Sequence, residues 1–200
     1  MHLFTTSAFS NCIFRVNRLD IQKRKALYSY IILLLTVSAY HAFSISLIRY
    51  FIPFLLISAS YALQKKINLR FNVRDALTGI IASAVILAPF GYILSLTGGS
   101  FEFMSLNGLL FQLLYASFPE EVYFRGLLQE RFGNNIKGIL SVSLLFSLMH
   151  LPRLIFLGDI YSVMTFFPSL IMGYLYMRTG NILPSIIFHL SANVVFLGFY

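Results

Sequence analysis

The sequence predicts an all-α membrane protein, a polytopic bundle of about seven transmembrane helices. The first reason is the composition: 58% of the 200 residues are hydrophobic and 11% are charged, whereas charged residues make up about a quarter of a soluble domain. The second is that apolar runs of about 20 residues, the length of a membrane span, recur along the chain. The third is that the basic residues lie between these runs. Lipid is the solvent that suits such a chain.

Seven apolar runs are expected to cross the membrane as helices. The expected spans are 26–43, 45–63, 76–96, 105–129, 139–150, 161–178 and 182–200. The boundary near residue 44 stays open, because one long helix could cover the first two runs. Turn signals separate the later spans. They are Thr97–Ser100, the polar segment 131–138, Leu151-Pro152-Arg153 at the end of the fifth helix, and Thr179-Gly180-Asn181.

The basic residues also predict the orientation of the chain. With a cytoplasmic N-terminus, twelve Lys and Arg residues lie in cytoplasmic segments, and only Arg49 and Arg153 fall on the other side. The charges of residues 1–25 do not have the order of a cleaved secretory signal. Residues 1–25 are therefore expected to form a cytoplasmic N-terminal segment, for which an amphipathic surface helix is one conformation, and 26–200 to form the transmembrane bundle. We expect a multi-pass protein of the bacterial inner membrane.

Charge and cysteine content exclude other classes. The net charge is +8, but the basic residues lie in short runs between apolar stretches, which is typical of loops beside anionic lipid. We therefore expect the lipid bilayer as a partner and no nucleic acid. Cys12 is the single cysteine, which excludes an intrachain disulfide framework and a multi-cysteine metal site.

Ionisable residues inside spans are candidates for function, because burying them in lipid costs several kcal/mol. This chain places five of them, and one amide, within its last spans. They are Glu120, Glu121, Arg125, His150, His189 and Asn193. Glu121 and Arg125 are four residues apart on one helix, so they can pair. Glu120 is turned about 100° away and cannot simply share that pairing.

The depths of these residues can be estimated at about 1.5 Å per helical residue. Counted from the cytoplasmic ends of their helices, Glu120, His150 and Asn193 all lie about 15–16 Å deep, and His189 about 10 Å. Three helices thus place polar groups in one layer. A carboxylate and an imidazole can activate a water molecule, and two further polar donors can stabilise an oxyanion. The pattern suits hydrolysis inside the membrane.

Three short motifs, in order, resemble the CPBP family (CAAX proteases and bacteriocin-processing enzymes, also called Abi). Glu120-Glu121-x-x-x-Arg125 is similar to its EExxxR motif, Phe146-x-x-x-His150 to its second motif and His189-x-x-x-Asn193 to its third. The resemblance covers about 105–200. It implies an intramembrane endopeptidase in which Glu120 and His150 activate water, while His189 and Asn193 stabilise the oxyanion. Glu121 and Arg125 support the site.

The resemblance leaves the cofactor, the substrate and the activity open to alternatives. Zinc could be bound by Glu120, His150 and His189. We favour a metal-free, glutamate-dependent enzyme, since the sequence has no HExxH pair and Asn193 is a poor zinc ligand. The expected substrate is a membrane-anchored or amphipathic peptide: a CAAX end, an exported peptide or a C-terminal sorting segment. The alternatives are a non-catalytic immunity or scaffold protein of the same fold, and a small transporter with a proton relay.

Overall fold

All regular structure in the described part of the chain is helical. The computed structural model describes residues 5–64, 66–96 and 100–199, and the side chains from residue 20 onward within these ranges. The elements are α1 (Thr5–Phe43), α2 (Ser46–Gln64), α3 (Val73–Leu96), α4 (Leu106–Phe111), η1 (Gln112–Ser117), α5 (Phe118–Glu121), η2 (Val122–Gln129), α6 (Glu130–Phe132), α7 (Ile136–Leu157), η3 (Ile160–Thr165), α8 (Phe166–Thr179) and α9 (Leu183–Phe199). The all-α prediction is confirmed.

Five helices in the described ranges are long and apolar enough to cross a membrane. They are Asp20–Phe43, Ser46–Gln64, Val73–Leu96, Ile136–Leu157 and Ile160–Thr179. The predicted count of about seven spans is therefore not confirmed. The two further segments differ for physical reasons. The segment from α4 to α6 carries the charged residues of the first motif, and α9 has only 17 residues.

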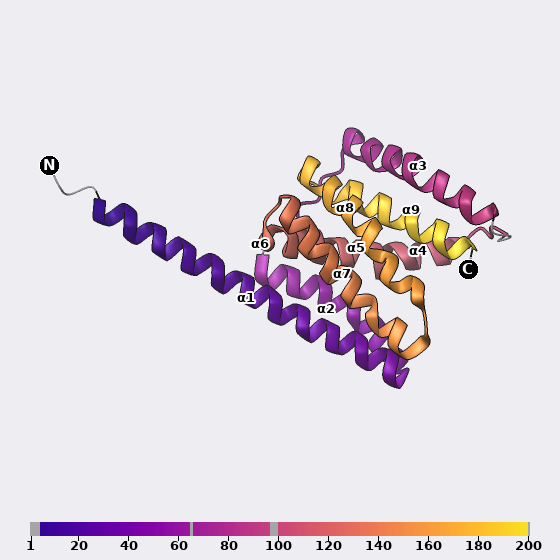
Figure 1. Cartoon of the computed structure of the whole chain (residues 1–200), viewed down its shortest axis with the longest axis horizontal. Coiled ribbons are helices and arrows are strands. Elements are labelled where there is room, and N and C mark those ends of the chain that lie inside the picture. Colours follow the sequence, from indigo (N-terminus) through magenta and orange to yellow (C-terminus); the bar gives the residue numbers. More distant parts are fainter. Residues whose placement is uncertain (1–4, 65, 97–99, 200) are drawn as a thin grey trace.

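The first span and the segment before it form one continuous helix. Helix α1 contains 39 residues, about 58 Å at 1.5 Å per residue, and its N-terminal part extends past the rest of the bundle (Figure 1). It ends before Ser44, which has a left-handed backbone with φ 53°, and α2 begins at Ser46. The first two apolar runs are therefore separate helices. The turn expected at Thr97–Ser100 falls mostly outside the described residues.

The fifth helix does not end at the proline, so this prediction is wrong. Helix α7 continues through Pro152 to Leu157 and ends at Gly158, which has the left-handed φ of 71°. Proline removes one helical hydrogen bond, but membrane helices tolerate it where neighbouring groups compensate, and Pro152 is buried. The helix also begins earlier than predicted, at Ile136, because Asn135 caps it by accepting from the Gly138 backbone N–H.

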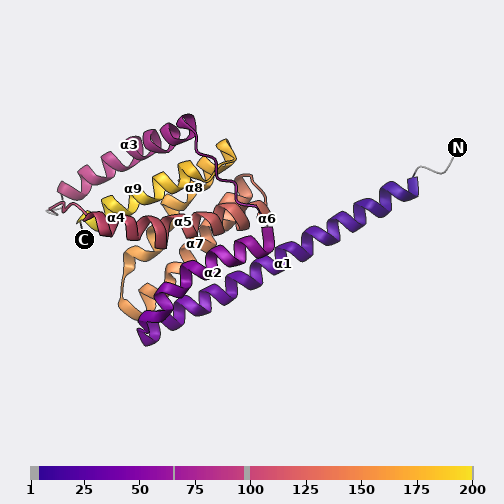
Figure 2. The ribbon, with the colours of Figure 1, turned by 180° about the vertical axis from the view of Figure 1, so that it is seen from behind.

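The helices pack in an arrangement that surrounds the segment from η1 to η2. Helix α1 packs against α2 and α7, α3 packs against α9, and α8 packs against both α7 and α9. The two opposite views show α3 and α9 side by side on one flank and α1 and α2 on the other (Figures 1 and 2). Every residue of η2 is buried. The first motif therefore lies in the interior of the bundle.

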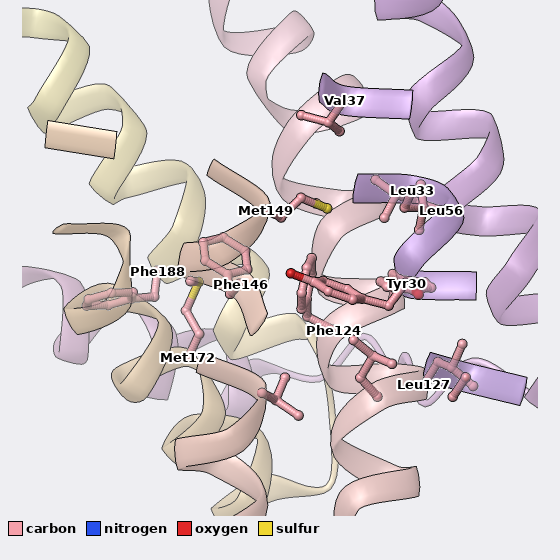
Figure 3. Close-up of a cluster of buried hydrophobic side chains, with 14 of the residues drawn as sticks. Tyr30, Leu33, Val37, Leu56, Phe124, Leu127, Phe146, Met149, Met172 and Phe188 are labelled. Atoms are coloured by element: carbon pink, nitrogen blue, oxygen red, sulfur yellow. The ribbon is translucent and has the colours of Figure 1, made fainter. Parts of the chain in front are cut away.

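An aromatic cluster fills the centre of this interior. Phe124 and Phe146 are almost fully buried, and their ring centroids are 4.8 Å apart. Figure 3 shows them among Tyr30, Met149 and Phe188, which come from three different helices. This cluster brings α1, η2, α7 and α9 together and fixes the distance between the helices that carry the motifs.

The turn before the last helix is hydrogen-bonded to the loop before α3 and to the first turn of α3. Gly180 has the left-handed φ of 60°, as the predicted turn requires. Asn181 is fully buried. Its side chain donates to the Arg70 carbonyl at 2.8 Å and to the Asp75 carboxylate at 2.7 Å, and it accepts from the Arg70 N–H at 3.0 Å. These hydrogen bonds fix the start of α9, and hence the third motif, relative to the start of α3.

Candidate active site

The two glutamates lie on a short α-helical segment between two π-helical ones. Helix α5 contains only four residues, and η1 and η2 flank it. A π-helical turn contains one more residue than an α-helical turn, and such turns frequently occur at functional sites. Their effect is to change which side chains face a given neighbour. Simple helical periodicity therefore does not predict every partner of this helix.

Glu121 and Arg125 form a fully buried ion pair. Arg125 Nε donates to Glu121 Oε2 at 3.1 Å, and neither side chain is exposed to solvent. Arg125 Nη2 also donates to the Ser169 hydroxyl of α8 at 2.8 Å. The pair predicted from the spacing of four residues is present. Ser169, which sequence reasoning did not connect with the site, ties it to a second helix.

His189 lies between the two glutamates. Its Nδ1 is 3.0 Å from Glu121 Oε1, and its Nε2 is 3.9 Å from Glu120 Oε2. Glu121 already accepts from Arg125, so it is ionised, and a carboxylate can only accept; His189 Nδ1 therefore carries a proton. The spacing argument had assigned Glu121 to Arg125 alone. In the structure Glu121 also fixes the ring of His189 and directs Nε2 toward Glu120.

Glu120 is the less constrained of the two carboxylates. Its side chain is 15% exposed, whereas that of Glu121 is fully buried. Its Oε2 atom is buried and makes no hydrogen bond with any described residue. At 3.9 Å, His189 Nε2 is too far away for a direct hydrogen bond. Glu120 therefore retains the capacity to accept from a third partner.

His150 lies on α7 and has a defined tautomer. Its Nδ1 is 2.8 Å from the Phe146 carbonyl oxygen of its own helix. Because a carbonyl oxygen can only accept, Nδ1 carries the proton, and in the neutral ring Nε2 keeps its lone pair. The Phe146 ring lies 4.8 Å from the His150 ring and 5.8 Å from the His189 ring, centroid to centroid. Within the described residues, no hydrogen bond or ion pair joins His150 to Glu120.

Asn193 contacts a residue that the motifs do not contain. Its Nδ2 donates to Gln112 Oε1 at 3.1 Å, and both side chains are half-buried. Gln112 lies eight residues before Glu120, about two helical turns toward the N-terminal end of the same helical segment. Its polarity within an apolar run was the sequence signal that could have drawn attention to it. The structure thus adds Gln112 and Ser169 to the predicted residues.

The proposed zinc ligands do not form a compact site in this geometry. Zinc needs its ligand atoms at about 2.0–2.2 Å. Across the described ranges, no group of three or more His, Cys, Asp or Glu side chains lies close enough to hold a metal ion. Glu121 Oε1 and His189 Nδ1 are occupied by each other. We therefore derive no step through a metal, and metal independence stays a prediction.

The apolar helices and the ionisable groups buried between them define the class of the protein, an integral membrane protein with an internal polar site. Residues 102–195 match the family model described as type II CAAX prenyl endopeptidase Rce1-like. This match agrees with the resemblance of the three motifs to the CPBP family of CAAX proteases. Comparisons with curated proteins and with solved structures found no match.

Proposed function

We propose that the protein is a glutamate-dependent intramembrane endopeptidase. The match of residues 102–195 to a CAAX protease family model supports a protease. The observation that carries the finer proposal is the position of His189, held by Glu121 at 3.0 Å with its other nitrogen 3.9 Å from Glu120. This arrangement gives the two glutamates different tasks. Glu121 orients an imidazole, and Glu120 acts on the reacting water.

Charge balance supports a protonated His189. With both glutamates ionised, Arg125 supplies one positive charge and an imidazolium supplies the second. The two carboxylates then face two cations, which avoids an uncompensated charge in a low-dielectric interior. A protonated ring donates from Nδ1 to Glu121 and keeps the Nε2 proton for a substrate. His189 can therefore act as a donor to an oxyanion.

In this mechanism Glu120 and the lone pair of His150 Nε2 hold and activate a water molecule. Glu120 removes a proton as the water oxygen forms a bond to the scissile carbonyl carbon. The negative charge that develops on the carbonyl oxygen is stabilised by the N–H groups of His189 Nε2 and Asn193 Nδ2. When the tetrahedral intermediate collapses, the C–N bond breaks and Glu120 returns its proton to the leaving amine.

The proposed substrate is a membrane-anchored or amphipathic peptide, because the site lies among buried residues of a membrane bundle. A CAAX-type end, an exported peptide and a C-terminal sorting segment all have this chemistry. We also propose seven crossings of the bacterial inner membrane with a cytoplasmic N-terminus. Hydrogen bonds between segment ends support this alternation. They join Arg131 to Leu63 and Ile182 to Asn68 at one end, and Glu102 to Gly198 at the other.

Co-expression with membrane-anchored peptides tests the proposed function. The cells would produce tagged peptides with CAAX ends, exported-peptide precursors or sorting segments, together with wild-type protein or its Glu120→Gln variant. We expect cleavage in the wild type alone, with mass spectrometry of the fragments locating one new terminus. Equal processing by both proteins, or by neither across all three peptide classes, would contradict the proposal and favour a non-catalytic immunity or scaffold protein.

A further inference from the structure

We propose that Gln112 is a positioning residue that orients the Asn193 amide toward the oxyanion. This inference rests on the proposed function. It concerns a residue outside the three motifs and assigns it a role that acts through Asn193 rather than on the substrate.

The geometry of the two amides carries this inference. Asn193 Nδ2 donates to Gln112 Oε1 at 3.1 Å. An amide nitrogen carries two hydrogen atoms, so one N–H is held by Gln112 and the second remains for another acceptor. The hydrogen bond also fixes the rotation of the Asn193 side chain. Without it, the amide could turn by 180° and present its oxygen, which repels an oxyanion instead of stabilising it.

The positions of the two residues in the bundle suit this role. Helix α9 packs against η1, and Asn193 lies four residues after His189, on the same face of α9. Gln112 and Glu120 lie on the same helical segment, two turns apart. One segment therefore supplies both the proposed base and the group that orients an oxyanion donor. The separation between Glu120 and Gln112 is therefore fixed by one continuous backbone.

Gln112 and Gln129 differ in burial and in what their hydrogen bonds connect. Gln112 and Asn193 are half-buried, while Gln129, the other glutamine on the segment, is fully buried. Gln129 donates to the Gly173 carbonyl at 2.9 Å and to Asn134 at 2.8 Å, which joins α8 and the loop before α7. Gln129 is therefore a matched control, because its hydrogen bonds hold helices together at the far end of the segment.

The experiment measures kcat, KM and thermal unfolding of purified protein in detergent. The probe set contains three fluorescence-quenched peptides. They are a peptide with a farnesylated CAAX end, the same peptide without the prenyl group, and the peptide that is cleaved on co-expression. Methionine replaces glutamine with a similar volume and no amide. We expect Gln112→Met to lower kcat about tenfold or more, equivalent to about 1.4 kcal/mol, with KM and the unfolding temperature unchanged. Gln129→Met should lower the unfolding temperature and leave kcat per folded molecule unchanged.

A double-mutant cycle separates positioning from other effects. If Gln112 acts through Asn193, adding Gln112→Met to Asn193→Ala should cause no further loss of kcat. Multiplied losses would overturn the inference, as would an unchanged kcat in Gln112→Met, or a fall in its unfolding temperature that accounts for the lost activity. In these cases the wild type still cleaves and Glu120→Gln does not, so the proposed function stands. If the wild type cleaves no member of the probe set, both proposals fail.

Discussion

The imidazole of His189 donates from Nδ1 to Glu121 Oε1 at 3.0 Å, and this contact engages one of the two adjacent glutamates. Glu121 accepts from His189 through one oxygen and from Arg125 through the other. Both its oxygens are thus engaged, and the side chain is fully buried. Glu120 has a buried oxygen with no hydrogen bond to any described residue. The two adjacent glutamates therefore differ: both oxygens of Glu121 are engaged, whereas Glu120 keeps an oxygen that makes no hydrogen bond with the described residues.

Replacing Glu121 with glutamine should destabilise the protein. The change leaves Arg125 buried without a counter-charge, and breaking a buried ion pair costs about 3–5 kcal/mol. We expect a lower unfolding temperature and lower abundance in membranes than for Glu120→Gln, which removes no ion-pair partner from Arg125. Fluorescence-detected size exclusion of heated membrane extracts measures both. If Glu120→Gln proves the less stable of the two, the roles of the glutamates are reversed.

The hydroxyl of Ser169 should contribute to stability through Arg125. Ser169→Ala leaves the Arg125 Nη2 donor buried without its 2.8 Å partner, and an unsatisfied buried donor costs about 1–3 kcal/mol. Ser191→Ala is the matched control, because the Ser191 hydroxyl donates only within its own helix, to the Ile187 carbonyl. Thermal unfolding of the two variants tests this. Equal unfolding temperatures would show that Ser169 does not support the arginine.

Reporter fusions test the proposed orientation. Fusions after Lys66 and Asn135 should report a cytoplasmic location, and a fusion after Gly158 should report the opposite side. The reason is the concentration of basic residues in the segments around the first two sites. Two reporters are fused at each site, one active only outside the cytoplasm and one active only inside it. Together they give two independent measurements of the location of that site. A non-cytoplasmic result at Lys66 or Asn135 would contradict the alternation.

Chelation tests the predicted metal independence. Purified protein should keep its cleavage activity after exhaustive treatment with a zinc chelator, and elemental analysis should find well under one zinc per chain. The physical reason is that each polar group already has one task, with Glu121 and His189 occupied by each other. Stoichiometric zinc, with activity lost on its removal and restored on its return, would overturn the metal-free mechanism. The similarity of residues 102–195 to a protease family would remain.

Local relationships could be predicted from the sequence, and contacts between helices could not. The Glu121–Arg125 pair follows from a spacing of four residues on one helix. The contact between His189 and Glu121 depends on how α9 packs against α5 and on the π-helical turns around it. Helical periodicity predicts neither the packing of these two helices nor the π-helical turns. The same limit explains why Gln112 was missed, since its partner lies 81 residues away.

Proline gave the clearest wrong prediction in the fold. A proline usually marks a helix end in soluble proteins. Pro152 lies inside α7, and the helix ends six residues later at Gly158, where a left-handed backbone is required. In a membrane bundle, tertiary packing and the lack of competing water keep the helix intact around a proline. The glycine was therefore the better end signal than the proline.

The central claim is that Glu120 is the base of a peptide hydrolysis reaction. The most direct test is the cleavage rate of purified wild-type protein and its Glu120→Gln variant on the peptide cleaved in co-expression, at equal amounts of folded protein. We predict that the substitution lowers kcat by at least a thousandfold, about 4 kcal/mol, while the unfolding temperature stays within a few degrees of the wild type. A Glu120→Gln variant that is folded and cleaves at the wild-type rate would contradict the claim.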